Sequence, residues 1–320
     1  MSCSMHVIDL LQCPLCGEGN LAETECGISC VKCGALYPVQ DGMPMLYEAG
    51  KVPESLKYEG LSCEVQERVP LSRWRRKISF LRNAVRWRLN RAGEELTPRC
   101  PVGPDYWMGR IAEILPQRPR NILDFGGGDG RYKSRVARQE DAYTILEPDE
   151  SSFFVRGNKD KYQYVIGDGH TCLFQKNVFD VILMLEVLEH VSDPATIIRN
   201  CGDWLKPGGI LIISAPQYWH IHAWPHDYYR YTIYGLQHLV TQAGLNPVQH
   251  WAMGGPCVLM WCVADLNFAP LFRMPVFKHL ISYPLLMLAK GMDRLFFRHN
   301  EKRRNPDTRG WMLVARKPPL

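Results

Sequence analysis

The stretch "ILDFGGGDGRY", residues 122–132, constrains the fold more than any other part of the chain. Apolar residues lead up to Asp124 and predict a buried strand, glycine occupies four of the five positions after Phe125, and "RYKSRVARQ" can begin a helix. Glycine permits positive φ and lets a ligand approach the main chain closely. We therefore expect a strand, turn and helix unit with a nucleotide-like ligand at the carboxyl end of the strand.

The glycine turn does not follow the dinucleotide pattern, which needs glycines at relative positions one, three and six. Counted from Gly126 the sixth position is Arg131, and counted from Gly128 it is Lys133. Asp129 would also place a negative charge beside a pyrophosphate. These observations predict a ligand without phosphates.

The segment "ILDFGGGDG" resembles the first motif of class I S-adenosylmethionine-dependent methyltransferases, and later segments follow in that family's order. They are "YTILEPDE", "VIGDGHTCLF", "FDVILMLEVLEHVSDP" and "LKPGGILIISAP", with "LNPVQHWAM" and "GWMLVARKP" as the expected last strands. Each strand-end acid alone is compatible with a solvated side chain in any doubly wound sheet, but five motifs in register favour cofactor binding. The resemblance implies an α/β doubly wound, Rossmann-like sheet.

The same resemblance implies the cofactor S-adenosylmethionine. Glu147 lies 17 positions after Gly130 and is suited to accept hydrogen bonds from both ribose hydroxyls, and Asp168 would contact the adenine amino group. The full set of expected cofactor-binding residues is Asp124, Gly126, Gly128, Gly130, Glu147, Asp168, Gly169 and Glu186.

Length and composition allow one large core and a smaller module, because the chain has 320 residues of which 46% are hydrophobic. The formal charge of +5 is mild, so local clusters matter more than the total. The start lacks a basic residue followed by a sustained apolar run, so we expect a cytoplasmic protein, with a peripheral position at the inner face of the membrane as an option. We expect a zinc ribbon in residues 1–50, a basic linker helix in 51–100, and a methyltransferase domain in 101–320 with a helical insertion at about 257–305.

The segment "CPLCGEGNLAETECGISCVKC" contains two C-x-x-C pairs, which can hold one ion tetrahedrally through four thiolates. The expected ligands are Cys13, Cys16, Cys30 and Cys33, with Cys26 as a substitute for Cys30. The following "GALYPVQDGMPMLY" predicts a strand, an Asp41-Gly42 turn and a strand, and residues 7–47 resemble small zinc-ribbon proteins that partner and activate methyltransferases. A redox pair is the alternative, but no thioredoxin-like pattern accompanies the cysteines. A closed Cys₄ site predicts structural Zn²⁺ without a part in the chemistry.

Two other segments indicate which surfaces or molecules the protein could contact. "LSRWRRKISFLRNAVRWRLNR" carries eight basic residues and no acid, and its apolar residues share one helical face. This helix can lie on an anionic membrane, bind RNA phosphates or pack on the catalytic domain. Some fifty residues after the sixth expected strand are rich in Leu, Met, Phe and Pro, are interrupted by charges, and suit an interfacial element, a helical subdomain or a dimer interface.

The loop at residues 217–231 should hold the acceptor, because it follows the fifth expected strand and ends at Thr232, the predicted N-cap of a helix that stops near Gly244. His226 is the leading candidate base, because its ordinary pKa lies near neutrality. A role in pinning the loop is the alternative for this histidine.

Other side chains near this loop complete the expected site. Asp227 or Glu189 would orient His226, and His190 is the second candidate base. Arg230 would bind an acidic acceptor through its guanidinium fork, and Tyr229 would stack on a sugar or close over the site.

The expected reaction is methyl transfer to oxygen, less readily to nitrogen, of a small-molecule, glycan or lipid-linked acceptor. An rRNA or tRNA methyltransferase is the first alternative, although "LEVLEH" stands where many amino-group methylating enzymes carry an Asn-Pro-Pro-Tyr type of motif. A non-catalytic scaffold that binds S-adenosylmethionine and recruits a partner methyltransferase is the second.

Overall fold

The structure is a computed structural model of the chain. It describes residues 7–18, 20–24, 27–47, 104–149, 155, 162–171, 173–223, 225–267, 278–297 and 307–319. The expected basic helix at 71–91 and the alternative ligand Cys26 lie outside these residues. Two compact units divide the chain: one joins residues 1–59, 107–251 and 310–320, and the other joins 60–106 and 252–309. The expected domain boundaries remain a prediction.

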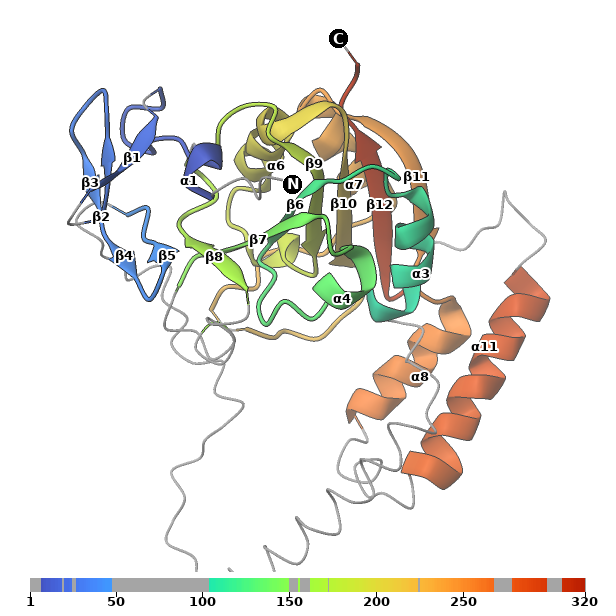
Figure 1. Cartoon of the computed structure of the whole chain (residues 1–320). Helices are drawn as coiled ribbons and strands as arrows, with labels where there is room; N and C mark the ends of the chain where they lie inside the picture. Colours follow the sequence, from blue (N-terminus) through green and yellow to red (C-terminus); the bar gives the residue numbers. More distant parts are fainter. Residues whose placement is uncertain are drawn as a thin grey trace, which may run out of the picture. The chain divides into compact units, whose positions relative to one another are not determined.

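The first unit is built on a seven-stranded sheet, drawn from green to red in Figure 1. Its central strands are apolar runs that are buried on both faces, which is typical of a parallel sheet covered by helices. In spatial order the strands are β11 (Asn246–Ala252), β12 (Gly310–Arg316), β10 (Leu205–Pro216), β9 (Phe179–Leu185), β6 (Asn121–Phe125), β7 (Ala142–Glu147) and β8 (Gln163–Ile166).

Strands β10, β9, β6, β7 and β8 pair in parallel, and β12 runs antiparallel to β10. The carboxyl ends of the parallel strands therefore lie along one edge of the sheet, where ligands bind in doubly wound folds. This topology confirms the predicted α/β doubly wound, Rossmann-like sheet.

Helices cover both faces of the sheet, because side chains alternate between the faces along each strand. Met108 and Ile111 of α3 (Pro104–Ile114) and Val136 of α4 (Lys133–Val136) share a core cluster with one face. On the other side, α6 (Pro194–Trp204) contacts β10, and α7 (Ile233–Gln242) contacts β12. Helix α4, which follows the glycine turn, is a single turn of four residues.

The two ends of α7 follow the sequence prediction. The Thr232 hydroxyl accepts a hydrogen bond of 3.1 Å from the Gly235 N–H, and Gly244 has φ +75° just after the helix. The cap fixes where α7 begins, and the described residues 217–223 and 225–231 form the predicted loop.

The N-terminal module consists of short elements: α1 (Val7–Leu10), β1 (Leu21–Thr24), β2 (Gly27–Cys30), β3 (Leu36–Tyr37), β4 (Val39–Gln40) and β5 (Met43–Pro44). Strands β4 and β5 pair through the Asp41-Gly42 turn, where both residues have positive φ, as predicted.

This module is continuous with the core of the first unit. Met45 forms a parallel bridge with Ile166 of β8, and the Leu46 N–H donates to the Ile166 carbonyl at 2.8 Å. The Tyr47 hydroxyl donates to the carbonyl of Pro148, the residue after Glu147, at 2.8 Å. The tail of the ribbon therefore extends the sheet beside β8.

The described part of the second unit is helical: α8 (Pro256–Asn267), η4 (Lys278–Ser282) and α11 (Tyr283–Phe297). The Asp293 carboxylate of α11 accepts hydrogen bonds from the N–H groups of Gly255, Cys257 and Val258, which caps the start of α8. The described residues include no helix that is long and apolar enough to cross a bilayer.

Candidate functional site

The glycine turn after β6 brings bare main chain to the carboxyl edge of the sheet. Gly126, Gly128 and Gly130 have φ values of +65°, +58° and +66°, which side-chain-bearing residues rarely adopt. A Cβ on Gly127 would lie 2.4 Å from the carboxylate carbon of Asp124. The sequence thus needs glycine here both for conformation and for space, and a ligand can contact the exposed peptide groups.

Two buried carboxylates, Asp124 and Glu147, flank this turn. The Tyr143 hydroxyl donates to Asp124 Oδ2 at 2.5 Å, and the Gly128 N–H donates to Glu147 Oε1 at 2.6 Å. Burial raises the pKa of Asp124 and that of Glu147 to about 7, because the charged form of each loses hydration. Such carboxylates are suited to bind hydroxyl and ammonium groups that compensate the burial.

Three more of the expected cofactor residues lie along the same edge. Asp168 follows β8, and its Oδ1 accepts from the N–H of His170 at 2.9 Å and lies 2.6 Å from its Nδ1. Burial acts to raise the pKa of Asp168, but the hydrogen bonds from His170 outweigh it and lower the pKa. A Cβ on Gly169 would lie 2.3 Å from the Phe125 ring, so this position is packed against the end of β6.

Glu186 follows β9 in a strained conformation, with φ +57°. Ser214 of β10 holds it there, because its hydroxyl accepts from the Glu186 N–H at 3.0 Å and lies 2.9 Å from Glu186 Oε1. Ser214 is fully buried. Strain that neighbours maintain in this way is characteristic of functional sites.

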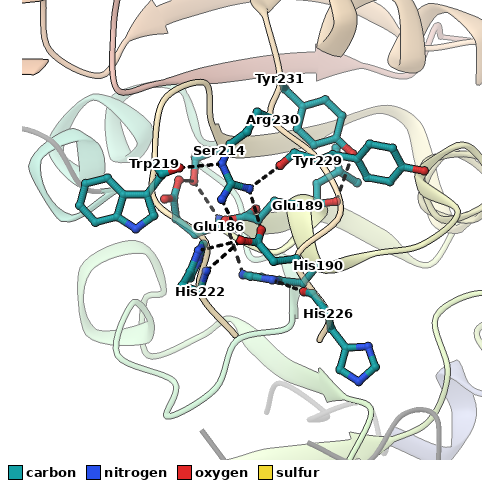
Figure 2. A network of polar contacts seen from close by, with 12 residues as sticks. Glu186, Glu189, His190, Ser214, Trp219, His222, His226, Tyr229, Arg230 and Tyr231 are labelled. Carbon is teal, nitrogen blue, oxygen red and sulfur yellow. Dashed lines mark hydrogen bonds and ion pairs between the residues drawn. The ribbon is translucent and has the colours of Figure 1, made fainter. Parts of the chain in front are cut away.

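The loop at 217–231 is held together by Asp227 and Arg230. The Arg230 guanidinium donates to both oxygens of Asp227 at 2.6 and 2.8 Å, and also to the carbonyls of Trp219, His220 and Tyr229. The hydrogen bonds from Arg230 lower the pKa of Asp227 to about 2. Figure 2 shows the guanidinium at the centre of this network. The prediction that Arg230 binds an acidic acceptor remains open, and in this structure the side chain organises the loop.

The loop is also tied to η3 (Leu188–His190), the turn that follows β9. The N–H groups of Tyr228 and Tyr229 donate to the Glu189 carbonyl at 2.8 and 3.2 Å. The Tyr229 hydroxyl donates to the Ser192 carbonyl at 3.0 Å, and that of Tyr231 to the Leu188 carbonyl at 3.1 Å. Because η3 and the loop follow neighbouring strands, their side chains share the edge that carries the expected cofactor residues.

The two candidate bases occupy different positions in this arrangement. His190 donates from Nδ1 to the His226 carbonyl at 2.6 Å, and burial lowers the pKa of His190. The ring of His226 has its Nδ1 3.0 Å from the Tyr228 hydroxyl and points away from the network in Figure 2. The structure thus brings the main chain of His226, rather than its ring, against His190.

One neighbour of these residues was not singled out from the sequence. The ring of His222 lies 4.7 Å from that of His190, centroid to centroid, in an edge-to-face arrangement. The run of histidines in "HIHAWPH" is the only sequence signal for it. Spacing alone does not show which of these histidines points toward η3, because the loop lacks a repeating structure.

The four expected zinc ligands form one cluster in the N-terminal module. Their sulfur atoms all lie within 4.8 Å of one another, with 3.6 Å between Cys13 and Cys33 and 3.7 Å between Cys16 and Cys30. Thiolates about 2.3 Å from a tetrahedral Zn²⁺ lie about 3.8 Å apart. Four cysteines at this spacing fit the ion, and the Tyr37 hydroxyl, 3.1 Å from Cys13 Sγ, packs against them.

Comparisons with known proteins agree with this geometry. A family model described as "Methyltransferase domain" matches residues 103–250. The chain is 30% identical over 200 residues to the ubiquinone biosynthesis O-methyltransferase of Dinoroseobacter shibae, a match that covers 53% of this chain and 81% of that protein. It is 29% identical over 142 residues to the protein of the same name from Coxiella burnetii, covering 38% of this chain and 61% of that protein.

Among solved structures, the chain resembles the 1,6-didemethyltoxoflavin-N1-methyltransferase of Burkholderia thailandensis at 17% identity and a TM-score of 0.43, covering 78% of this chain and 92% of that one. Of the two relatives matched in sequence, the chain spans less than two thirds of the Coxiella protein but most of the Dinoroseobacter protein. The match to the Dinoroseobacter relative, with the glycine turn, the strand-end carboxylates and the order of the sheet, places the chain in a family: it belongs to the S-adenosylmethionine-dependent methyltransferases.

Proposed function

We propose that the protein transfers the methyl group of S-adenosylmethionine to an oxygen atom of a small-molecule, glycan or lipid-linked acceptor. The observation that carries the proposal is the loop of histidines and tyrosines fixed to η3, beside Glu186 at the edge where Asp124 and Glu147 end their strands. The names of the two relatives support oxygen rather than nitrogen as the methylated atom.

The proposed reaction depends more on aligning the acceptor with the methyl group than on activating the methyl donor. The sulfonium is an activated methyl donor, so the C–S bond breaks as the C–O bond forms, its electron pair stays on sulfur, and the acceptor hydroxyl loses a proton. Asp124, Glu147, Asp168 and the glycine turn would hold the cofactor, and the loop would align the acceptor with the methyl group.

His226 is proposed to accept the proton from the acceptor hydroxyl, with His190 as the second candidate. His226 is half-buried, and its Nδ1 lies 3.0 Å from the Tyr228 hydroxyl, which would help to orient the ring for proton transfer. Burial lowers the pKa of His190, which favours the neutral imidazole that a base requires. Tyr229 and Arg230 remain proposed contacts of the acceptor.

The helices of the second unit support a peripheral position on the membrane. Large apolar side chains stand exposed on all three elements: Met260 and Val263 on α8, Leu280 and Ile281 on η4, and Leu285, Met287, Leu288, Met292 and Leu295 on α11. Arg294 is exposed on the same helix as the last five. An apolar face with nearby cations is suited to an anionic lipid surface.

Vesicle binding tests this surface. The protein should sediment with phosphatidylglycerol vesicles, and Leu288→Asp should reduce the bound fraction about fivefold or more because a charge enters the apolar face. Tyr234→Asp is the matched control, because Tyr234 is 78% exposed on α7 in the first unit. Equal binding by both variants would exclude the α11 face as the membrane contact.

Zinc is proposed to fold the N-terminal module without taking part in methyl transfer. Because Met45, Leu46 and Tyr47 contact β8 and Pro148, loss of the ion should also loosen the strand end that carries Glu147. Cys13→Ser should therefore lower the zinc content and the melting temperature, whereas Cys257→Ser on α8 should change neither. Unchanged melting with abolished turnover would assign the metal to the chemistry instead.

The substrate class is tested by incubating the purified protein with methyl-labelled S-adenosylmethionine and cell extract. RNA, lipid-linked and small water-soluble fractions are then separated and counted. Label in the lipid or soluble fraction supports the proposal. Label in RNA would favour an RNA methyltransferase, and tight cofactor binding without label in any fraction would favour the scaffold.

A further inference from the structure

Three metal-ligating side chains converge beside the proposed acceptor loop. Glu189 and His190 come from η3 and His222 comes from the loop, and one ligand atom of each lies within 4.8 Å of the others. The Glu189 side chain is 1% exposed, that of His190 12% and that of His222 30%. The cluster is thus buried on the η3 side and reachable from the loop side, and Figure 2 shows the two imidazoles next to one another.

The hydrogen bond of His190 fixes which of its ring nitrogens faces the cluster, and His222 makes comparable contacts through Nδ1. His190 donates from Nδ1 to the His226 carbonyl, so its Nε2 carries the lone pair and lies 3.7 Å from Glu189 Oε1. His222 Nδ1 lies 3.2 Å from the His220 carbonyl and 3.5 Å from Asp227 Oδ2. In metal sites a histidine ligand usually donates its second N–H to a carbonyl or carboxylate, which orients the ring. Both histidines already make such contacts.

The charges around the cluster favour a cation. Arg230 is the cation of the loop, and its two hydrogen bonds to Asp227 balance its charge. The carboxylates of Glu189 and Glu186 are close enough to act on Arg230 and add negative charge beyond that pair. A divalent ion would compensate this excess beside Glu189, whose carboxylate is buried.

We propose that Glu189, His190 and His222 bind one divalent cation. Two imidazole nitrogens and one carboxylate oxygen suit Zn²⁺, Mn²⁺ or Fe²⁺, and three protein ligands leave positions open for a further oxygen. Ligands each about 2.1 Å from an ion lie at most about 4.2 Å apart, so the cluster would close by a few tenths of an ångström on binding.

The role of the ion rests on the proposed function, whereas its binding does not. In methyl transfer to oxygen, the ion would hold the acceptor oxygen at the loop and favour its ionised form. His190 would then act as a ligand, and proton transfer would fall to His226. This site is distinct from the four cysteines of the ribbon, whose soft thiolates select Zn²⁺.

The experiment titrates Mn²⁺ into the full-length protein with its ribbon zinc in place and follows free Mn²⁺ by electron paramagnetic resonance. We expect one Mn²⁺ per chain, displaced by excess Zn²⁺, which binds nitrogen and oxygen sites more tightly. His222→Gln and Glu189→Gln should each weaken Mn²⁺ binding at least tenfold. His238→Gln, an exposed histidine on α7, should leave it unchanged.

Absence of Mn²⁺ binding, or equal binding by the wild type and His222→Gln, would overturn the proposal. His222 lies on a partly exposed loop, so this variant keeps the test decisive if Glu189→Gln fails to fold. S-adenosylmethionine affinity is measured on the same proteins and should not change. A protein that binds Mn²⁺ but methylates no acceptor would refute the proposed function and leave the metal site standing.

Discussion

Two regions of the molecule position their side chains by different physical means. The cofactor edge is the glycine turn and the strand ends proposed to bind the cofactor, and the acceptor loop is the loop at 217–231, proposed to hold the acceptor. At the cofactor edge, Asp124 and Glu147 are the last or next-to-last residues of buried strands, and the glycine turn supplies main-chain groups. In the acceptor loop, an ion pair between Asp227 and Arg230 replaces regular structure. The first arrangement is set by the sheet, and the second by the Asp227–Arg230 pair together with hydrogen bonds from the loop to η3.

The carboxylates of the two regions also differ in their pKa values. Burial raises the pKa of Asp124 and Glu147 to about 7, whereas Arg230 lowers the pKa of Asp227 to about 2. A carboxylate with a raised pKa gains stability when a ligand compensates its charge, and one with a lowered pKa is already compensated within the protein. The comparison indicates that the charges of Asp124 and Glu147 would be compensated by a bound ligand, whereas the charge of Asp227 is already compensated by Arg230.

Replacing Glu147 by alanine should give the largest effect on cofactor binding. The proposed contact is two charge-assisted hydrogen bonds to ribose, so its loss should weaken S-adenosylmethionine binding a few hundred-fold, or about 3.5 kcal/mol. Calorimetry on Glu147→Ala checks this value, with Glu113→Ala, an exposed acid on α3, as the control. An unchanged affinity would remove Glu147 from the cofactor site.

Replacing His226 in the acceptor loop by alanine should lower turnover and leave cofactor binding nearly unchanged. Loss of a general base lowers kcat by about 100-fold at the least, while the dissociation constant of S-adenosylmethionine should change less than about twofold. Turnover and cofactor binding are measured on His226→Ala and on the exposed control His238→Ala. If both quantities fell together in His226→Ala, the histidine would pin the loop rather than take the proton.

The cofactor edge could be predicted from the sequence because its geometry follows from local pattern and sheet topology. Apolar runs that end in Asp124 and Glu147 become parallel strands, and parallel strands end along one edge. The same reasoning predicted where α7 begins, because Thr232 is a strong cap.

The acceptor loop and the ribbon contact could not be predicted in the same way. The bond between Asp227 and Arg230 depends on how an irregular loop closes, and the approach of His222 to His190 depends on which side of it faces η3. The bridge from Met45 to Ile166 joins residues far apart in sequence, so no local pattern reports it. The sequence predicted that a helix could begin after the glycine turn, but nothing in it indicated that α4 would be a single turn.

Replacing Asp227 by asparagine tests the ion pair that holds the loop, and we expect a smaller effect than for the two preceding substitutions. The loop would lose its bidentate pair, and displaced side chains should lower kcat/KM about 10- to 30-fold. The cofactor affinity should stay unchanged, because no described contact joins Asp227 to the glycine turn. Steady-state kinetics compare Asp227→Asn with Asp203→Asn, a surface acid 3.5 Å from Lys176. Wild-type kinetics in Asp227→Asn would show that the loop does not depend on this pair.

The smallest expected effect is a pH dependence that follows from the raised pKa values of Asp124 and Glu147. Their ordinary values are 3.8 and 4.5, and burial raises both to about 7, so the free protein binds protons more tightly than the unfolded chain does. The stability contributed by these groups is fully present below about pH 4 and is lost as pH rises through 7.

Cofactor binding should show the opposite trend with pH, because the ionised carboxylates make the stronger hydrogen bonds. Affinity for S-adenosylmethionine should rise about tenfold from pH 6 to pH 8. Thermal unfolding with and without cofactor at both pH values measures the two trends together, and Glu147→Gln should flatten the rise because the amide does not titrate. An affinity that does not change between pH 6 and pH 8 would mean that Asp124 and Glu147 ionise in the same way with and without the cofactor. The electrostatic difference between the cofactor edge and the loop would then disappear.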